Sequence, residues 1–393
     1  MFSGFWQKIG CWPNDIRNHW KNNEDWLWFH AVSVGELNAI FPLVQKLKNI
    51  KSKYPIIISC TTKAGYEHAK TLTRNSDICV IYFPFDIPLV LKSFFNKIKI
   101  KLLIIAETEI WPNILNECKN REIPVILING RLSDKSFRNY HLFKFYFKNV
   151  LNNFSEILTQ SQKDTEKYLK LGANTATVET IGNLKFYTDD DYFKENNNLE
   201  LNGGHGNIIF ASTHEGEELL AIETYKELLK IKNNIRLIIA PRHITRVTQI
   251  VDLIKREGFD VTLRSENKKT NTSHNIFLLD TIGELKHIFK FCPVTIIGGT
   301  FTKVGGHNIL EPIKAGSYTI IGPYDFKIKE LTSVFIGNNA LVQVKNKDEL
   351  VVEILDALNN NEQVKERINN GVILIKKNEN VIEKYLEHIL KYL

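Results

Sequence analysis

The sequence predicts an α/β fold made of two doubly wound domains, each built on a parallel β-sheet. Short apolar runs alternate with longer amphipathic stretches through most of the 393 residues, and a polar break at 187–206 separates them into two series. The apolar runs are rich in β-branched residues and are apolar on both faces. This pattern is typical of parallel strands that helices cover on both sides.

The first series contains six apolar runs that we interpret as strands. They lie at 26–32, 54–60, 78–83, 101–106, 123–129 and 156–160. The second series contains five, at 207–212, 235–240, 275–280, 294–299 and 318–322. Helices are predicted between the strands, for example at 36–50 and 216–231, where apolar residues roughly follow the 3.6-residue period of a helix.

The domain boundaries follow from this division. We expect a first domain at 1–186 and a second at 207–375. The linker at 187–206 combines an acidic cluster, an Asn run and a Gly-rich end. The tail at 376–393 has the apolar spacing of an amphipathic helix and is expected to close the structure, packed back across the domain junction.

Composition excludes several classes of protein. Hydrophobic residues make up 43% and charged residues 24% of the chain, which excludes disordered, collagen-like and disulfide-scaffold proteins. The five cysteines have no metal-binding spacing and indicate a reducing, cytoplasmic compartment. The net charge of +7 permits an anionic substrate or a membrane surface, and no nucleic-acid partner, metal or cofactor is predicted. Without GxxxxGK[ST] or a GxGxxG after the first strand, NTP hydrolysis is excluded and a dinucleotide oxidoreductase disfavoured.

The amino-terminal segment is unusually rich in tryptophan. Five of the six tryptophans lie in the first 28 residues, at positions 6, 12, 20, 26 and 28. Tryptophan favours the bilayer interface, so these rings would attach the protein to a membrane; equally, they would simply pack under the first domain. No apolar run approaches the roughly 18 residues of a spanning helix, so we expect peripheral rather than transmembrane attachment.

Candidate site residues follow the predicted strands, because ligands of open parallel sheets bind beyond the carboxyl ends of the strands. In the first domain Glu36 opens a helix after HAVSVG, either as a general base or as an ordinary first-turn carboxylate. Glu107 and Glu109 follow the strand at 101–106, either as acceptor ligands or as a helix-terminal charge cluster. The next strand leads into a loop rich in hydrogen-bond donors, suited to phosphate or carboxylate or simply solvated, with Asn129, Arg131 and Ser133.

The second domain presents candidates for an anion site. Ser212 and Thr213 follow one strand, either as phosphate ligands or as plain helix caps, and Pro241 and Arg242 follow the next. Ile282, Gly283 and Glu284 form a further turn. The strongest motif is the loop and helix start with Gly305, Gly306, His307, Asn308, Ile309, Leu310 and Glu311. We interpret its glycines as permitting close approach of a phosphate group, and Glu311 as binding ribose hydroxyls.

Eight of these blocks resemble one family in their order along the chain. HAVSVGE, ETEIWPN, NGRLS, IGNLKF, ASTHEGEE, PRH, DTIGEL and GGTF…GGHNILEP are similar to the 3-deoxy-D-manno-octulosonic acid (Kdo) transferases of lipopolysaccharide synthesis. The resemblance covers about 27–322. It implies a GT-B glycosyltransferase, with two Rossmann-like domains facing across a cleft, that acts on the cytoplasmic face of the bacterial inner membrane.

The resemblance also implies a reaction. The amino-terminal domain would hold the lipid A precursor (lipid IVA) and the carboxyl-terminal domain CMP-Kdo. Glu36 would be the catalytic base of an inverting, metal-independent transfer, and the segments around Arg242, Glu284 and Glu311 would hold CMP. A GT-B glycosyltransferase or epimerase using another sugar nucleotide is the alternative. One departure is that family members usually begin with an apolar anchor helix, whereas here about 25 aromatic and mixed-charge residues precede the first strand.

Overall fold

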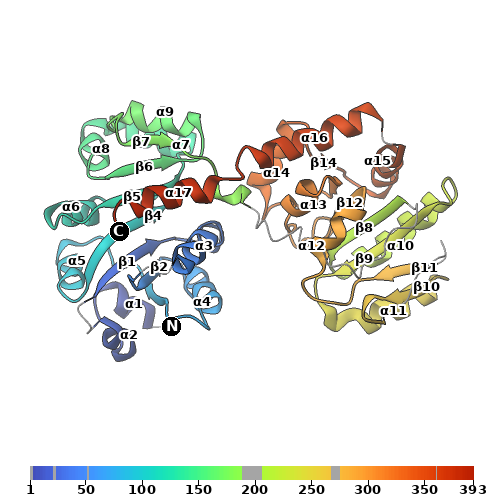
Figure 1. The fold of residues 1–393 in the computed structure, drawn as a ribbon, viewed down its shortest axis with the longest axis horizontal. Coiled ribbons are helices and arrows are strands. Elements are labelled where there is room, and N and C mark those ends of the chain that lie inside the picture. Colours follow the sequence, from blue (N-terminus) through green and yellow to red (C-terminus); the bar gives the residue numbers. More distant parts are fainter. Residues whose placement is uncertain (1–2, 21–23, 51–52, 188–205, 267–274, 360) are drawn as a thin grey trace. The chain divides into compact units, whose positions relative to one another are not determined.

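A computed structural model describes residues 3–20, 24–50, 53–187, 206–266, 275–359 and 361–393. The chain divides into two compact units: Met1–Tyr187 with Asn378–Leu393, and Thr188–Lys377 (Figure 1). The predicted linker at 187–206 lies, apart from its two end residues, outside the described residues. In the described part of the chain, no helix combines the length and apolar character needed to cross a bilayer.

The first unit is built on a seven-stranded sheet in the order β3-β2-β1-β4-β5-β6-β7, in which every neighbouring pair is parallel. Its strands are β1 (Asp25–His30), β2 (Ile56–Cys60), β3 (Cys79–Tyr82), β4 (Lys99–Ala106), β5 (Val125–Gly130), β6 (Glu156–Thr159) and β7 (Val178–Thr180). The order reverses at β1 and β4, so the loops after these two strands diverge at the switch point where ligands of such sheets bind.

Helices cover both faces of this sheet. The helices are α1 (Ser3–Lys8), α2 (Asn14–His19), α3 (Val34–Asn49), α4 (Lys63–Leu72), α5 (Pro88–Phe95), α6 (Pro112–Asn120), α7 (Asp134–Leu142), α8 (Lys144–Leu151), α9 (Gln162–Leu171) and α17 (Val381–Leu390). Residues of α5, α6, α8 and α9 share one buried cluster with the sheet, and residues of α3, α4 and α17 share the other. The carboxyl-terminal helix therefore belongs to the first unit, where it packs against α3.

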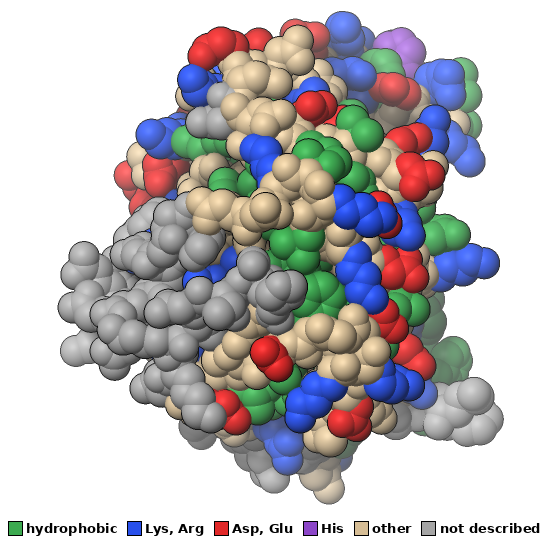
Figure 2. Space-filling view, turned by 90° about the vertical axis from the view of Figure 1, so that its right-hand side faces the viewer, with side chains coloured by type: hydrophobic (Ala, Val, Ile, Leu, Met, Phe, Trp, Pro, Cys, Tyr) green, Lys and Arg blue, Asp and Glu red, His purple; other side chains and the backbone are tan. Residues whose placement is uncertain are grey.

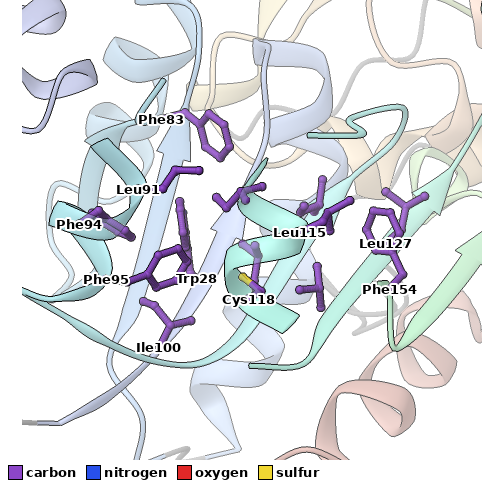
Figure 3. Packing of buried hydrophobic residues seen from close by; sticks show 14 of the residues in the cluster. Trp28, Phe83, Leu91, Phe94, Phe95, Ile100, Leu115, Cys118, Leu127 and Phe154 are labelled. Carbon is purple, nitrogen blue, oxygen red and sulfur yellow. The ribbon is translucent and has the colours of Figure 1, made fainter. Parts of the chain in front are cut away.

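Four of the five amino-terminal tryptophans are core residues. Trp12, Trp20, Trp26 and Trp28 are at most 6% exposed and join the cluster beneath α5 and α6. Figure 3 shows Trp28 packed among Phe94 and Phe95 of α5 and Phe83, which follows β3. Packing under the first domain is thus the correct interpretation for these four rings, and of this group only Trp6, at 52%, stays exposed.

The second unit repeats the architecture with a sheet in the order β10-β11-β9-β8-β12-β13-β14, again parallel. Its strands are β8 (Gly206–Thr213), β9 (Ile235–Pro241), β10 (Asp260–Leu263), β11 (Asn275–Leu278), β12 (Val294–Ile297), β13 (Tyr318–Ile321) and β14 (Val342–Gln343). Its helices are α10 (Glu217–Leu229), α11 (Val247–Arg256), α12 (Leu285–Ile288), α13 (Leu310–Lys314), α14 (Lys329–Gly337), α15 (Lys347–Asn359) and α16 (Glu362–Lys376). Here the order reverses at β8 and β12.

All eleven predicted strands are present, and the α/β fold with two parallel sheets is confirmed. Three strands were not predicted, namely β7, β10 and β14. Two of them, β7 and β14, are sheet edges of only two or three residues, and β10 is a partly exposed edge strand of four. These three strands are very short or partly exposed, and so lack the continuous apolar runs on which the prediction relied.

Candidate functional site

In the first unit, Glu36 is positioned by the turn between β1 and α3. Ser33 caps the helix by accepting a hydrogen bond from the Glu36 N–H at 3.3 Å. In return the Glu36 carboxylate accepts bonds from the Val32 N–H at 2.7 Å and from Ser33 Oγ at 3.1 Å. This reciprocal pattern resembles a capping box, except that the carboxylate accepts from the N–H one residue before the N-cap; the side chain therefore has a structural role and is held in one orientation beyond the end of β1.

The surroundings of Glu36 favour its protonated form. The carboxylate is half-buried, and burial raises its pKa from 4.5 to about 7, with further contributions from the negative charges of Glu107 and Glu109. The bond from Val32 opposes this shift without cancelling it. A carboxylate with a pKa near neutrality can take a proton and release it again at physiological pH, which is the property of a general base.

Glu107 and Glu109 follow β4, the strand beside β1, and so lie within electrostatic reach of Glu36. Glu107 has a backbone φ of 60°, uncommon for a residue other than glycine, and its carboxylate pairs with Lys185 at 2.7 Å in a largely buried ion pair. Burial, followed by the charge of Glu107, raises the pKa of Glu109. Three carboxylates and one lysine therefore gather at the switch point of the first sheet.

Lys185 was not among the predicted site residues. It lies in the short 3-10 helix Leu184–Phe186, inside the family block IGNLKF, and that block was the only signal for it in the sequence. Its contribution is clear only in three dimensions, because it compensates the charge of a carboxylate almost 80 positions earlier in the chain.

The predicted acceptor loop has more structural roles than expected. Asn129 is fully buried, and its side-chain oxygen accepts from the Leu184 N–H at 3.0 Å, which anchors the Lys185 segment. A contact of this residue with an acceptor stays a prediction. Ser133 is the N-cap of α7 and accepts from the Ser136 N–H. Arg131 is half-buried, and its N–H approaches the Glu107 carbonyl at 3.4 Å.

In the second unit, the end of β8 and the loop that follows it are held by two buried carboxylates, Glu217 and Glu218. The alternative that Ser212 or Thr213 caps α10 is wrong, because the helix starts at Glu217 with Gly216 as its N-cap. Ser212 has a φ of 61°. Thr213 Oγ1 donates to Glu218, which also receives a bidentate pair of bonds from Arg246 at 2.8 and 3.0 Å.

Glu217 connects the loops that follow β8 and β12. Its carboxylate, 2% exposed, accepts hydrogen bonds from the N–H groups of His214, Gly299 and Phe301 at 2.8–3.0 Å. Gly298 lies so close to β8 that a Cβ there would come within 2.2 Å of the Ser212 carbonyl oxygen. The two loops at the switch point of the second sheet are thus joined through one buried carboxylate.

The glycine loop before α13 has a structural explanation. Gly305 and Gly306 have φ values of 100° and 92°, and a Cβ on either would collide with Phe326 or Ile328 at 2.6–2.7 Å. Both N–H groups donate to the Gly299 carbonyl at 2.8 Å. These glycines make room for neighbouring side chains, and their N–H groups are already used within the loop. That they also allow a phosphate to approach stays a prediction.

Two histidines meet where these loops converge. The rings of His214 and His307 stack at 4° with 2.7 Å between their Nε2 atoms, so one ring donates and the other accepts. Burial lowers the pKa of both, that of His307 to about 4, with further contributions from His214 and Arg242. Arg242 is exposed at the end of β9, next to Pro241. Burial thus disfavours a positive charge on either ring of the pair.

The remaining predicted CMP residues lie at two helix starts. Asn308 accepts from the Leu310 N–H at 2.9 Å and donates to Glu311 at 3.0 Å, which orients a half-buried carboxylate in the first turn of α13. Ile309 is fully buried. Glu284 pairs with Arg264 at 2.8 Å and also accepts from Thr281, beside the exposed Gly283 and Ile282.

Among the described residues, no cluster of three or more His, Cys, Asp or Glu suited to a metal ion is present.

The chain is similar in sequence to proteins of one transferase family. A family model described as 3-deoxy-D-manno-octulosonic-acid transferase (kdotransferase) matches residues 3–188. A 3-deoxy-D-manno-octulosonic acid transferase from Rickettsia bellii is 30% identical over 96% of this chain and 90% of its own. One from Rickettsia felis is 32% identical over 93% and 79%.

A bifunctional glycosyltransferase/methyltransferase from Fusobacterium nucleatum is 35% identical over 88% of this chain. The chain spans about half of that relative, 55% of its length. Among solved structures, a glycosyltransferase from Rickettsia africae matches with a TM-score of 0.52 at 13% identity, over 94% of this chain and 99% of its own. This likeness concerns the fold and confirms the predicted GT-B class.

Proposed function

The chain belongs to the 3-deoxy-D-manno-octulosonic acid transferase family, and from this premise we propose that it transfers Kdo from CMP-Kdo to the lipid A precursor lipid IVA in lipopolysaccharide synthesis. The observation that carries the mechanism is Glu36, a half-buried carboxylate with a pKa near 7 beyond the first strand of the first unit. We propose that it acts as the general base.

In the proposed reaction a primary hydroxyl of the acceptor attacks the anomeric carbon of Kdo from the side opposite CMP. The new bond joins the acceptor oxygen to that carbon, the bond to the CMP phosphate oxygen breaks, and the hydroxyl proton passes to Glu36. The configuration at the anomeric carbon is thereby inverted. The transition state would resemble an oxocarbenium ion, as in other glycosyl transfers.

The donor is assigned to the second unit. Arg242 is exposed at a strand end, where it would bind the CMP phosphate, and the pair of His214 and His307 lies within electrostatic reach of it. Glu311 is oriented by Asn308 and would accept bonds from the ribose hydroxyls. CMP leaves as a monophosphate of modest charge, so these groups would stabilise it without a divalent metal.

The acceptor is assigned to the first unit. Lys185, paired with Glu107, and the basic loop around Arg131 would bind the phosphates or the carboxylate of a lipid A precursor. We propose that the protein works as a peripheral protein on the cytoplasmic face of the bacterial inner membrane, where such an acceptor is presented.

The test is the mass of the product formed from lipid IVA and CMP-Kdo. The protein should add Kdo, whereas Glu36→Gln should not, although calorimetry should show that the variant binds CMP as tightly as wild type. Near-wild-type turnover of Glu36→Gln would refute its role as the base. Thermal shifts that rank UDP, GDP or ADP above CMP would instead favour the alternative, a GT-B enzyme acting on another sugar nucleotide.

A further inference from the structure

An exposed apolar surface lies at the junction of α7 and α8 in the first unit. Leu142, Phe143, Phe145 and Tyr146 are 79%, 67%, 92% and 55% exposed, and Phe145 is the most exposed large hydrophobic side chain of the described residues. We call these four residues the α7–α8 tip. Together α7 and α8 form the connection from β5 to β6 (Figure 1).

The exposure of the tip does not result from loose packing of the two helices. Phe137 and Tyr140 of α7 pack against the core cluster, and Tyr140 also contacts Phe147 of α8 with ring centroids 4.4 Å apart. Val150 of α8 is buried. The helices are thus anchored at both ends, and the residues between these anchors project away from the unit.

The charge around the tip is strongly positive. Residues 131–148 contain five basic side chains and one acidic side chain, an excess of four positive charges in 18 residues of a chain whose total is +7. The acidic residue, Asp134, pairs with Lys167 at 2.7 Å. By contrast, basic and acidic side chains are interspersed over the face of the molecule in Figure 2.

We propose that the α7–α8 tip is the surface by which this protein docks on an anionic phospholipid bilayer, with its rings inserted at the level of the headgroups. Lys144 lies between Phe143 and Phe145, and a lysine there can extend to lipid phosphates while the rings enter the apolar layer. The cores of protein–protein interfaces are depleted of charged residues, so this arrangement favours lipid over a second protein.

The position of the tip suits the proposed lipid acceptor, on which this inference rests. Helix α7 starts directly after Arg131 and Ser133, in the loop that follows β5. A bilayer bound at the tip would therefore present lipid headgroups close to the loop assigned to the acceptor. The sequence suggested that the amino-terminal tryptophans attach the protein to a membrane. The proposal assigns this role to the α7–α8 tip of the same unit instead.

Vesicle flotation of the full chain tests the proposal. Wild type should float with vesicles of phosphatidylethanolamine and phosphatidylglycerol, and the double variant Leu142→Ser, Phe145→Ser should reduce the membrane-bound fraction by about tenfold or more. The pair Lys144→Glu, Lys148→Glu should weaken binding to these vesicles, because it reverses the charge that faces anionic lipid. All four side chains are exposed, so unfolding temperatures should stay at the wild-type value.

The matched control is Trp6→Ser, which removes an exposed ring of the same unit outside the tip. It should float as wild type does. Flotation of the Leu142, Phe145 variant at the wild-type level, loss of flotation in Trp6→Ser alone, or failure of wild type to bind would each overturn the proposal.

A second readout separates this proposal from the proposed function. With lipid IVA in detergent micelles, the tip variants should transfer Kdo at the wild-type rate, and with lipid IVA in vesicles they should lose transfer. If wild type transfers nothing in micelles, the proposed function fails, and flotation still decides whether the tip binds membrane.

Discussion

Glu36→Gln is expected to abolish transfer and at the same time to stabilise the first unit at alkaline pH. Burial raises the pKa of Glu36 from 4.5 to about 7 in the folded protein. Between these values the folded protein keeps a proton that the unfolded chain has released, so the free energy of unfolding falls as the pH rises. A difference of about 2.5 pKa units corresponds to at most about 3 kcal/mol.

Gln resembles the protonated acid and does not titrate, so the variant avoids this loss. It can still accept the bond from the Val32 N–H, and the weakened contact with Ser33 should cost about 1 kcal/mol or less. Near pH 4 the two proteins should therefore unfold at similar temperatures. At pH 8 the first unit of the variant should be more stable by about 2–3 kcal/mol, or roughly 4–12 °C.

The assay is differential scanning calorimetry of both proteins between pH 4 and pH 8, alongside transfer measurements. Ser33→Ala is the control: it removes the helix cap but keeps the carboxylate, so it should lose about 1 kcal/mol, still lose stability as the pH rises, and retain most of its activity. A stability difference between Glu36→Gln and wild type that does not grow with pH would refute the reasoning, because Glu36 would then ionise as freely as in the unfolded chain.

Three further outcomes are expected. In Lys185→Met the charge of Glu107 is uncompensated and opposes ionisation of the general base, so the acidic limb of the kcat/KM profile should move up by about one pH unit; an unmoved limb would contradict this. In Glu217→Ala three N–H groups lose their acceptor. Calorimetry should show that the free energy of unfolding of the second unit falls by about 3 kcal/mol or more, while that of the first unit stays constant. Gly305→Ala combines a φ of 100° with a clash and should destabilise the second unit in urea by about 2–4 kcal/mol, against about 1 for the unobstructed Gly283→Ala; equal losses would argue against the clash.

The central strands and the residues beyond them were predictable from the sequence. Eleven apolar runs became eleven strands, because a strand buried on both faces needs a continuous apolar stretch. The turn that contains Glu36 was also predictable, since Ser33 and Glu36 have the spacing of a capping box. The order of the eight family blocks also pointed to the correct family. These blocks stand out in the sequence because they interrupt the regular alternation of strands and helices, and several of them follow directly after a strand.

What each polar residue contacts was decided only by the tertiary structure. Asn129 and Arg131 look alike in sequence as donors in a polar loop, yet one is fully buried beneath the segment of Lys185 and the other is half-buried. Gly305 has the composition of a phosphate loop, but Phe326, 21 positions later, fills the space beside it. Local sequence determines which backbone elements form, because periodicity and capping act over a few residues. Burial, charge compensation and raised pKa values depend on groups that are distant in the chain and adjacent only in the folded protein.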